Sequence, residues 1–94
     1  MTEASISSRV KLSEDVLFQE LQGDAVLLDL KTGVYFGLDR VGTRMWHLMG
    51  ETKALSGVVD TILEEFDVTR ERCSADILTL VGRLEEQGLL SVEP

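Results

Sequence analysis

Hydrophobic residues in the first half of the chain form three short runs separated by turn-forming residues. The runs cover residues 16–21, 24–30 and 34–38. The first two are separated by Gln22-Gly23, and the last two by residues 31–33, which end in a glycine suited to a positive φ. Connections this short join antiparallel neighbours, so the pattern predicts a three-stranded antiparallel meander.

The middle run places alternate residues on opposite faces of its strand. Val26, Leu28 and Leu30 share one face, and Leu27 points to the other. Before the meander, Val10 and Leu12 predict a short additional strand.

The second half of the chain has the apolar spacing of helices over residues 39–49, 54–66 and 70–87. Thr69 is suited to cap the N-terminus of the last helix, and Gly88 is suited to end it. The pattern therefore changes from strands to helices near residue 39.

This order predicts one α+β domain of residues 9–94, in which a three-stranded antiparallel β-meander is followed by three helices. A compact three-helix unit with an antiparallel ribbon is the winged helix-turn-helix plan, which we expect here. The small, polar residues 1–8 are expected to form a flexible N-terminal arm. The last apolar residues are expected to form a short extended tail: Leu89, Leu90 and Val92.

The 94 residues carry a net charge of −8 and are 44% hydrophobic, which suffices for one small core. Because a duplex DNA-binding surface is normally basic, this charge argues against nucleic acid and equally against an anionic membrane. The first residues lack the pattern of a signal peptide, and no stretch is long enough to span a membrane. We expect a cytoplasmic protein that suits a neutral or basic partner.

The third predicted helix is apolar over more of its circumference than one core contact requires. An arc of about 100° holds Leu80, Cys73, Leu84, Ile77 and Val81. Leu78 lies well beyond that arc. Two interpretations stay open: this extra edge packs on the sheet, or Leu78 and Val81 form one wall of a groove beside the sheet.

The strand at residues 34–38 has an outer edge that a three-stranded meander leaves unpaired. No proline or charge interrupts its sequence, which is VYFGL. A peptide that adds a strand pairs with such an edge through backbone hydrogen bonds. The alternatives are that the C-terminal tail or a second copy of the chain covers the edge.

Candidate catalytic residues are few. Cys73 fits the apolar stripe of its helix and is expected to be a buried structural thiol, and His47 is the single histidine. No spacing of His, Cys and carboxylates indicates a metal site, and the glycines match no phosphate-binding loop. We therefore expect no catalytic residue, no metal and no cofactor, and a protein that is not an enzyme.

Residues 23–49, GDAVLLDLKTGVYFGLDRVGTRMWHLM, resemble the PqqD-like family of peptide-modification chaperones. The features that carry the resemblance are the VLLDL strand, the Thr-Gly turn, the aromatic strand ending in Leu38-Asp39, and Gly42 followed by Trp46. The resemblance continues through LSGVVDTILEEF, VTRER and EEQGLL, so it covers about residues 10–92.

This family, known as the RiPP recognition element, is a winged helix-turn-helix that binds leader peptides of ribosomally made precursors instead of DNA. The resemblance implies that a leader docks as an added strand in the groove beside the third helix. The peptide-binding residues expected there are Val34, Tyr35, Phe36, Gly37, Leu38, Ile77, Leu78, Val81, Gly82 and Glu85.

Within the family, the VLLDL, Thr-Gly and aromatic pattern is most similar to the stand-alone proteins of lasso-peptide clusters. Such proteins are expected to hand the precursor to a separate cysteine-protease-like leader peptidase, and from there to a cyclase. Their leaders commonly carry a tyrosine and a proline separated by two residues. Two alternatives stay open: a partner of a radical modifying enzyme, as in pyrroloquinoline-quinone synthesis, and a winged-helix DNA-binding regulator.

Overall fold

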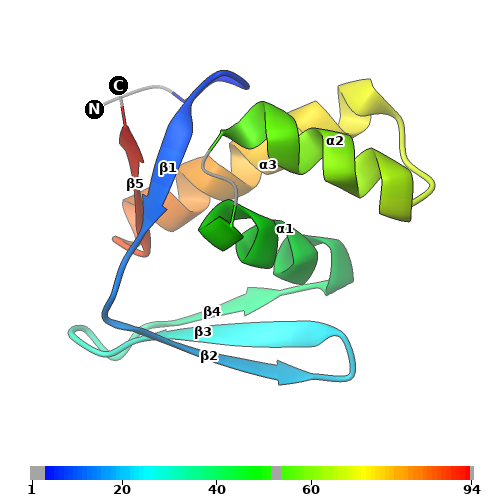
Figure 1. Cartoon of the computed structure of the whole chain (residues 1–94). Coiled ribbons are helices and arrows are strands. Elements are labelled where there is room, and N and C mark those ends of the chain that lie inside the picture. The colour runs from blue at the N-terminus through cyan, green and yellow to red at the C-terminus, as the bar shows by residue number, and fades with distance from the viewer. Residues whose placement is uncertain (1–3, 52–53, 94) are drawn as a thin grey trace.

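The computed structural model describes residues 4–51 and 54–93. In chain order its elements are β1 (Arg9–Leu12), β2 (Val16–Leu21), β3 (Asp24–Asp29), β4 (Tyr35–Leu38), α1 (Arg40–Glu51), α2 (Leu55–Glu65), α3 (Arg70–Glu86) and β5 (Leu90–Glu93). Figure 1 shows the helices over one face of the sheet β2–β3–β4, with β1 and β5 side by side at one end. The predicted α+β order of three antiparallel strands followed by three helices is confirmed.

The first hairpin follows from its two turn residues. Leu21 pairs with Asp24, so Gln22 and Gly23 alone connect β2 to β3. Their φ angles of 55° and 91° are the two positive values that a type I′ turn requires. The predicted tight hairpin is therefore confirmed, and β4 continues the antiparallel order β2-β3-β4.

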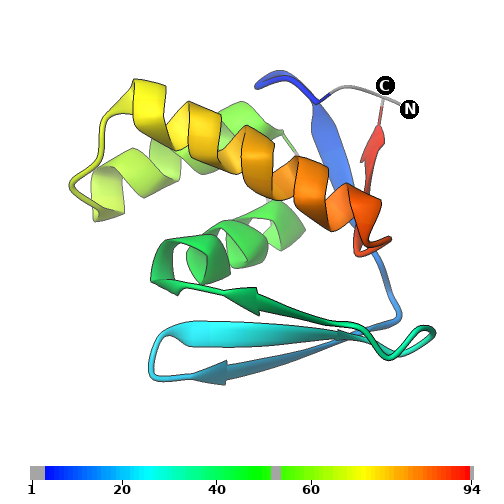
Figure 2. The same cartoon turned by 180° about the vertical axis from the view of Figure 1, so that it is seen from behind.

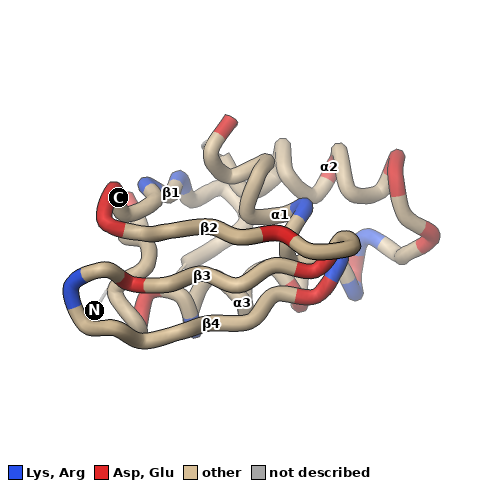
Figure 3. The backbone as a smooth tube through the Cα atoms, turned by 90° about the horizontal axis from the view of Figure 1, so that it is seen from below, with Lys and Arg blue, Asp and Glu red and all other residues tan. Residues whose placement is uncertain are grey.

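The three-stranded sheet has one face in the core and one face exposed. Ala25 and Leu27 point inward and are buried, whereas Val26 and Leu30 are exposed. The predicted alternation is therefore present, and the face that holds Val26, Leu28 and Leu30 is the outer one. Figure 3 shows this outer face from below, with charged positions towards the ends of the strands.

The chain ends form a second, two-stranded sheet. β1 and β5 pair antiparallel, with Val10 opposite Val92 and Leu12 opposite Leu90. The additional strand at Val10 and Leu12 was predicted, but its pairing with the C-terminal tail was not. Since the tail pairs with β1, it does not cover the edge of β4.

The helix ends have local causes that the sequence indicates. The Thr69 hydroxyl accepts the Arg72 N–H at 3.1 Å and caps α3. At the other end Gly88 has a φ of 75°, and the Leu89 N–H donates to the Leu84 carbonyl at 2.9 Å, as in a Schellman motif. Both predicted caps are confirmed. α1 runs on to Glu51, beyond its predicted end at residue 49.

The segment before β1 packs on the domain where it is described. Ala4 and Ile6 are half-buried against the core, and the Leu55 N–H donates to the Ser8 carbonyl at 3.0 Å. Residues 1–3 of the predicted arm lie outside the described residues. Among the described helices, none combines the length and the apolar character needed to cross a bilayer.

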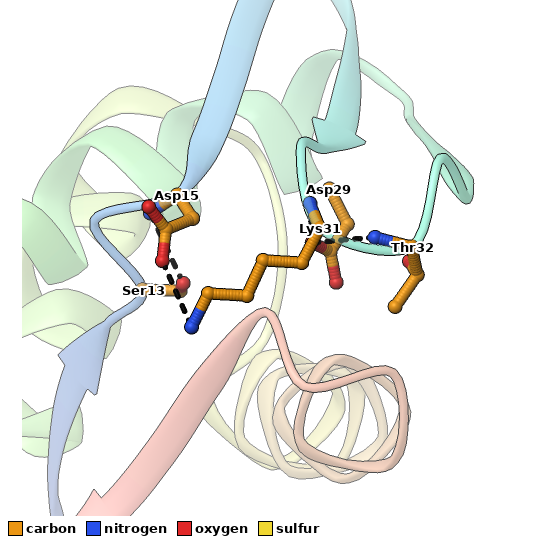
Figure 4. Close-up of polar contacts among 5 residues, drawn as sticks. All are labelled: Ser13, Asp15, Asp29, Lys31 and Thr32. Carbon is orange, nitrogen blue, oxygen red and sulfur yellow. Dashed lines mark hydrogen bonds and ion pairs between the residues drawn. The ribbon is translucent and has the colours of Figure 1, made fainter.

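Polar contacts tie the β3–β4 turn to the segment that enters β2 (Figure 4). The Asp29 carboxylate accepts the Lys31 N–H at 2.9 Å, and Lys31 Nζ lies 3.0 Å from Asp15. The backbone hydrogen bond from Lys31 lowers the pKa of Asp29, and the hydrogen bond to Asp15 raises the pKa of Lys31. These contacts hold in place the turn from which β4 begins.

Candidate functional site

β4 is an edge strand whose free backbone groups can be assigned. In an antiparallel pair, alternate residues direct both backbone groups to the neighbour. The Asp29 N–H donates to the Val34 carbonyl at 2.9 Å, so the backbone groups of Val34 point to β3. The backbone groups of Phe36, two residues further along the strand, point to β3 as well. The N–H and C=O groups of Tyr35 and Gly37 therefore point to the open edge.

A groove lies between this edge and α3, on the side of the molecule that Figure 2 turns to the viewer. Its larger part, about 460 Å³, is lined by Phe36, Gly37, Leu38, Asp39, Val41, Gly42, Met45, Asp76, Thr79, Leu80 and Arg83. Its smaller part, about 300 Å³, is lined by Val34, Tyr35, Phe36, Gly37, Arg83, Glu86 and Gln87. We call the two parts together the β4–α3 groove.

The start of α1 lines part of this groove. The Asp39 carboxylate accepts the Gly42 N–H at 2.8 Å and caps the helix. A Cβ atom at Gly42 would lie 3.1 Å from Asp39 Oδ1 and 3.5 Å from a methyl group of Leu38. A glycine therefore lets the helix begin close against β4, and Val41 and Met45 of the same helix line the groove.

Arg83 connects the two walls. Its guanidinium carbon lies 5.4 Å from the centre of the Phe36 ring, within the range of a cation–π contact. Arg83, Phe36 and Gly37 line both parts of the groove, so this contact marks the boundary between them.

The predicted site residues of the strand all line the groove, but those of the helix do not. Ile77 and Val81 have 0% of their surface exposed, so they belong to the core and cannot touch a peptide. Leu78, Gly82 and Glu85 are half-buried and do not line the groove. At about 100° per residue, Leu78 points about 160° away from Leu80. Their peptide-binding role stays a prediction that this geometry does not favour.

Of the lining residues that the sequence analysis did not predict, four form one stripe of α3. They are Asp76, Thr79, Leu80 and Arg83, spaced i, i+3, i+4 and i+7. Leu80 stands at the edge of the buried arc, which was the one available signal. That stripe is mostly polar, so hydrophobic periodicity carries no further signal for it.

The candidate catalytic residues occupy structural positions. Cys73 is buried, and burial raises the pKa of its thiol, which disfavours the reactive thiolate. His47 packs on Phe18, with ring centres 4.8 Å apart, and its Nε2 lies 3.8 Å from Glu20. Within residues 4–51 and 54–93, no three His, Cys, Asp or Glu side chains are grouped to hold a metal ion.

Comparison with known proteins identifies the family. The model of coenzyme PQQ synthesis protein D (PqqD) matches residues 24–90. TbiB1, in a structure of its complex with the TbiA(beta) leader peptide, is 38% identical, with a TM-score of 0.79 over 86% of this chain and 94% of that one. A lasso peptide synthetase B1 complexed with its leader peptide shares the fold at 23% identity, with a TM-score of 0.78 over 88% and 98%. No curated protein matches significantly. The chain belongs to the PqqD family.

Proposed function

We propose that this protein binds the leader segment of a ribosomally synthesised precursor peptide, which pairs as an added strand with β4. The observation that carries the proposal is the open edge of β4, where the backbone groups of Tyr35 and Gly37 border a groove with apolar lining residues. Such an edge is a template for an extended peptide. The 38% identity to TbiB1, whose structure contains a leader peptide, supports the binding of a leader peptide by this chain.

In this arrangement affinity and selectivity have different sources. Backbone hydrogen bonds to Tyr35 and Gly37 supply affinity for any extended chain. Selectivity comes from alternate leader side chains, because every second one enters the β4–α3 groove while the others face outward. The apolar lining residues Leu38, Met45 and Leu80 favour an apolar anchor in the larger part of the groove.

The proposed precursor is that of a lasso peptide, and the protein presents it to a separate cysteine-protease-like leader peptidase and then to a cyclase. The VLLDL, Thr-Gly and aromatic pattern supports this class. The outer face of the sheet suits the hand-over, since it exposes Leu17 and Val26 and continues across β4 to the leader. Val26→Asp is expected to leave leader binding unchanged and to slow leader removal by the peptidase.

A role without catalysis is part of the proposal. The buried, pKa-raised thiol of Cys73 and the packed ring of His47 support it, because neither is placed as a nucleophile or a base in the groove. Incubation of the protein alone with a precursor peptide is expected to leave the peptide mass unchanged. A product that forms with the wild type and not with Cys73→Ala would contradict this.

The second candidate is a partner of a radical enzyme in coenzyme PQQ synthesis, which the description of the matching family favours. The two candidates share the same groove and differ in the peptide that enters it. We further propose that the protein is cytoplasmic. We also propose that its helices and strands form a winged helix-turn-helix that binds peptide and not DNA.

The direct test is titration calorimetry with the TbiA(beta) leader peptide, a peptide of the same composition in scrambled order, and a precursor peptide of coenzyme PQQ synthesis. We expect the first peptide to bind and the scrambled one to fail. Tighter binding of the PQQ precursor would support the second candidate. Equal binding of ordered and scrambled peptides would contradict leader recognition.

A further inference from the structure

Arg83 occupies the middle of the β4–α3 groove and lines both of its parts. The other charged side chains on the walls are the carboxylates of Asp39, Asp76 and Glu86. Among the lining residues, all of which the structure describes, Arg83 is thus the one cation. A peptide bound in the groove is therefore close to one positively charged side chain, and the other charged side chains around it are carboxylates.

Two other arginines of the helices show how a guanidinium is paired in this fold. Arg44 makes a bidentate ion pair with Glu65, with both N–O distances at 2.7 Å. Arg70 Nη2 lies 2.8 Å from Asp60 Oδ1. Arg83 has no ion pair with any residue that the structure describes. Its hydrogen-bond donors are therefore available to a ligand.

The contact with Phe36 holds Arg83 in a defined position. The cation–π contact leaves the N–H groups of Arg83 without a hydrogen bond or ion pair to any residue that the structure describes. Those N–H groups match the two oxygens of a carboxylate. Because the side chain is already positioned, less rotamer freedom is lost when the pair forms.

We propose that Arg83 is a specificity-determining residue, which selects peptides with an Asp or Glu carboxylate at the position opposite Phe36, on the face of the added strand that Arg83 covers. The inference rests on the proposed strand addition to β4. A peptide with Lys or Arg at that position would place two cations together and is rejected. If Arg83 instead donated only to peptide carbonyl groups, binding would show no preference for charge at any position.

The experiment selects binders from a displayed library of random peptides, with wild-type protein, Arg83→Glu and Arg70→Glu in parallel. Arg70→Glu is the matched control, since it makes the same change of charge on the same helix outside the groove lining. We expect wild-type and Arg70→Glu proteins to enrich Asp or Glu at one position. Arg83→Glu is expected to enrich Lys or Arg at that same position.

A representative selected peptide then enters a double-mutant cycle measured by fluorescence anisotropy. Arg83→Glu is expected to weaken binding about tenfold or more, and Glu→Lys in the peptide to restore most of it. Enriched peptides without a charge preference, or a preference that Arg83→Glu leaves unchanged, would overturn the role of Arg83 while strand addition stands. No enrichment by wild-type protein, despite correct folding, would overturn peptide binding itself and this inference with it.

Discussion

α3 has two flanks beside its buried stripe, and they have different neighbours. One flank holds Leu78, Gly82 and Glu85. The other holds Asp76, Thr79, Leu80 and Arg83, and it forms the wall of the groove that faces β4. Helical periodicity identifies the stripe that is buried between them. Helical periodicity does not tell which flank lies beside the sheet, because that depends on how α3 is oriented against α1 and α2.

The largest expected effect is a loss of stability when a charge is placed in the buried stripe of α3 and not on either flank. Val81→Asp places a carboxylate where no surface is exposed. The cost is about 3 kcal/mol or more, a large fraction of the stability of a small domain. We expect the loss of cooperative thermal unfolding in circular dichroism, while Leu78→Asp still melts cooperatively. A Val81→Asp protein that melts near the wild-type temperature would show that the stripe is misassigned.

The next prediction compares the flanks directly, with Leu80→Asp and Leu78→Asp as a matched pair. Both leucines are half-buried against the core, but only Leu80 lines the groove. Leu80→Asp is expected to weaken leader binding about a hundredfold, because a charge must be buried under the peptide. Leu78→Asp should bind nearly as wild type in calorimetry. The reverse order would move the peptide to the other flank of α3.

A smaller effect is expected at the edge of β4, where the backbone can be changed without a change of charge. Gly37→Pro removes an N–H that points to the open edge and leaves the ladder to β3 intact. We expect leader binding to weaken about tenfold. Gly37→Ala is the control, since its Cβ meets nothing within 4 Å and its N–H remains. Equal affinities of the two variants would argue against strand pairing there.

The smallest effect concerns the turn that precedes β4. The pKa of Asp29 is lowered in the folded state by the Lys31 N–H, so its contribution to stability is present above the unfolded pKa of about 3.9. That contribution is lost as the pH falls through the lowered folded value. Asp29→Asn keeps an acceptor but does not titrate. We expect its urea midpoint to fall less between pH 6 and 2.5 than the wild-type midpoint; parallel curves would contradict this.

Local features were predictable because each has a local cause. The two positive φ angles at Gln22 and Gly23, the Thr69 cap and the Gly88 stop depend on a few neighbouring atoms. The open edge of β4 also followed from the short connections of the meander. The open edge is the wall of the candidate site that β4 supplies.

The rest depends on contacts between distant parts of the chain. The pairing of β1 with β5 joins the two ends of the domain, and neither strand carries a signal for its partner. The helix wall of the groove was missed for the same reason. Asp76 and Arg83 look like solvated residues in the sequence, and only the tertiary fold, which brings this flank of α3 opposite β4, makes them line a groove.

The most direct test of the central claim is amide exchange of single residues of β4, measured by NMR with and without a saturating leader peptide. In the free protein, the amides of Tyr35 and Gly37 should exchange fast, since they point to the open edge, while Phe36 is protected by β3. Strand addition predicts that Tyr35 and Gly37 become protected on binding and that the open edge of β2 does not change. Fast exchange of Tyr35 and Gly37 in the saturated complex would contradict the account.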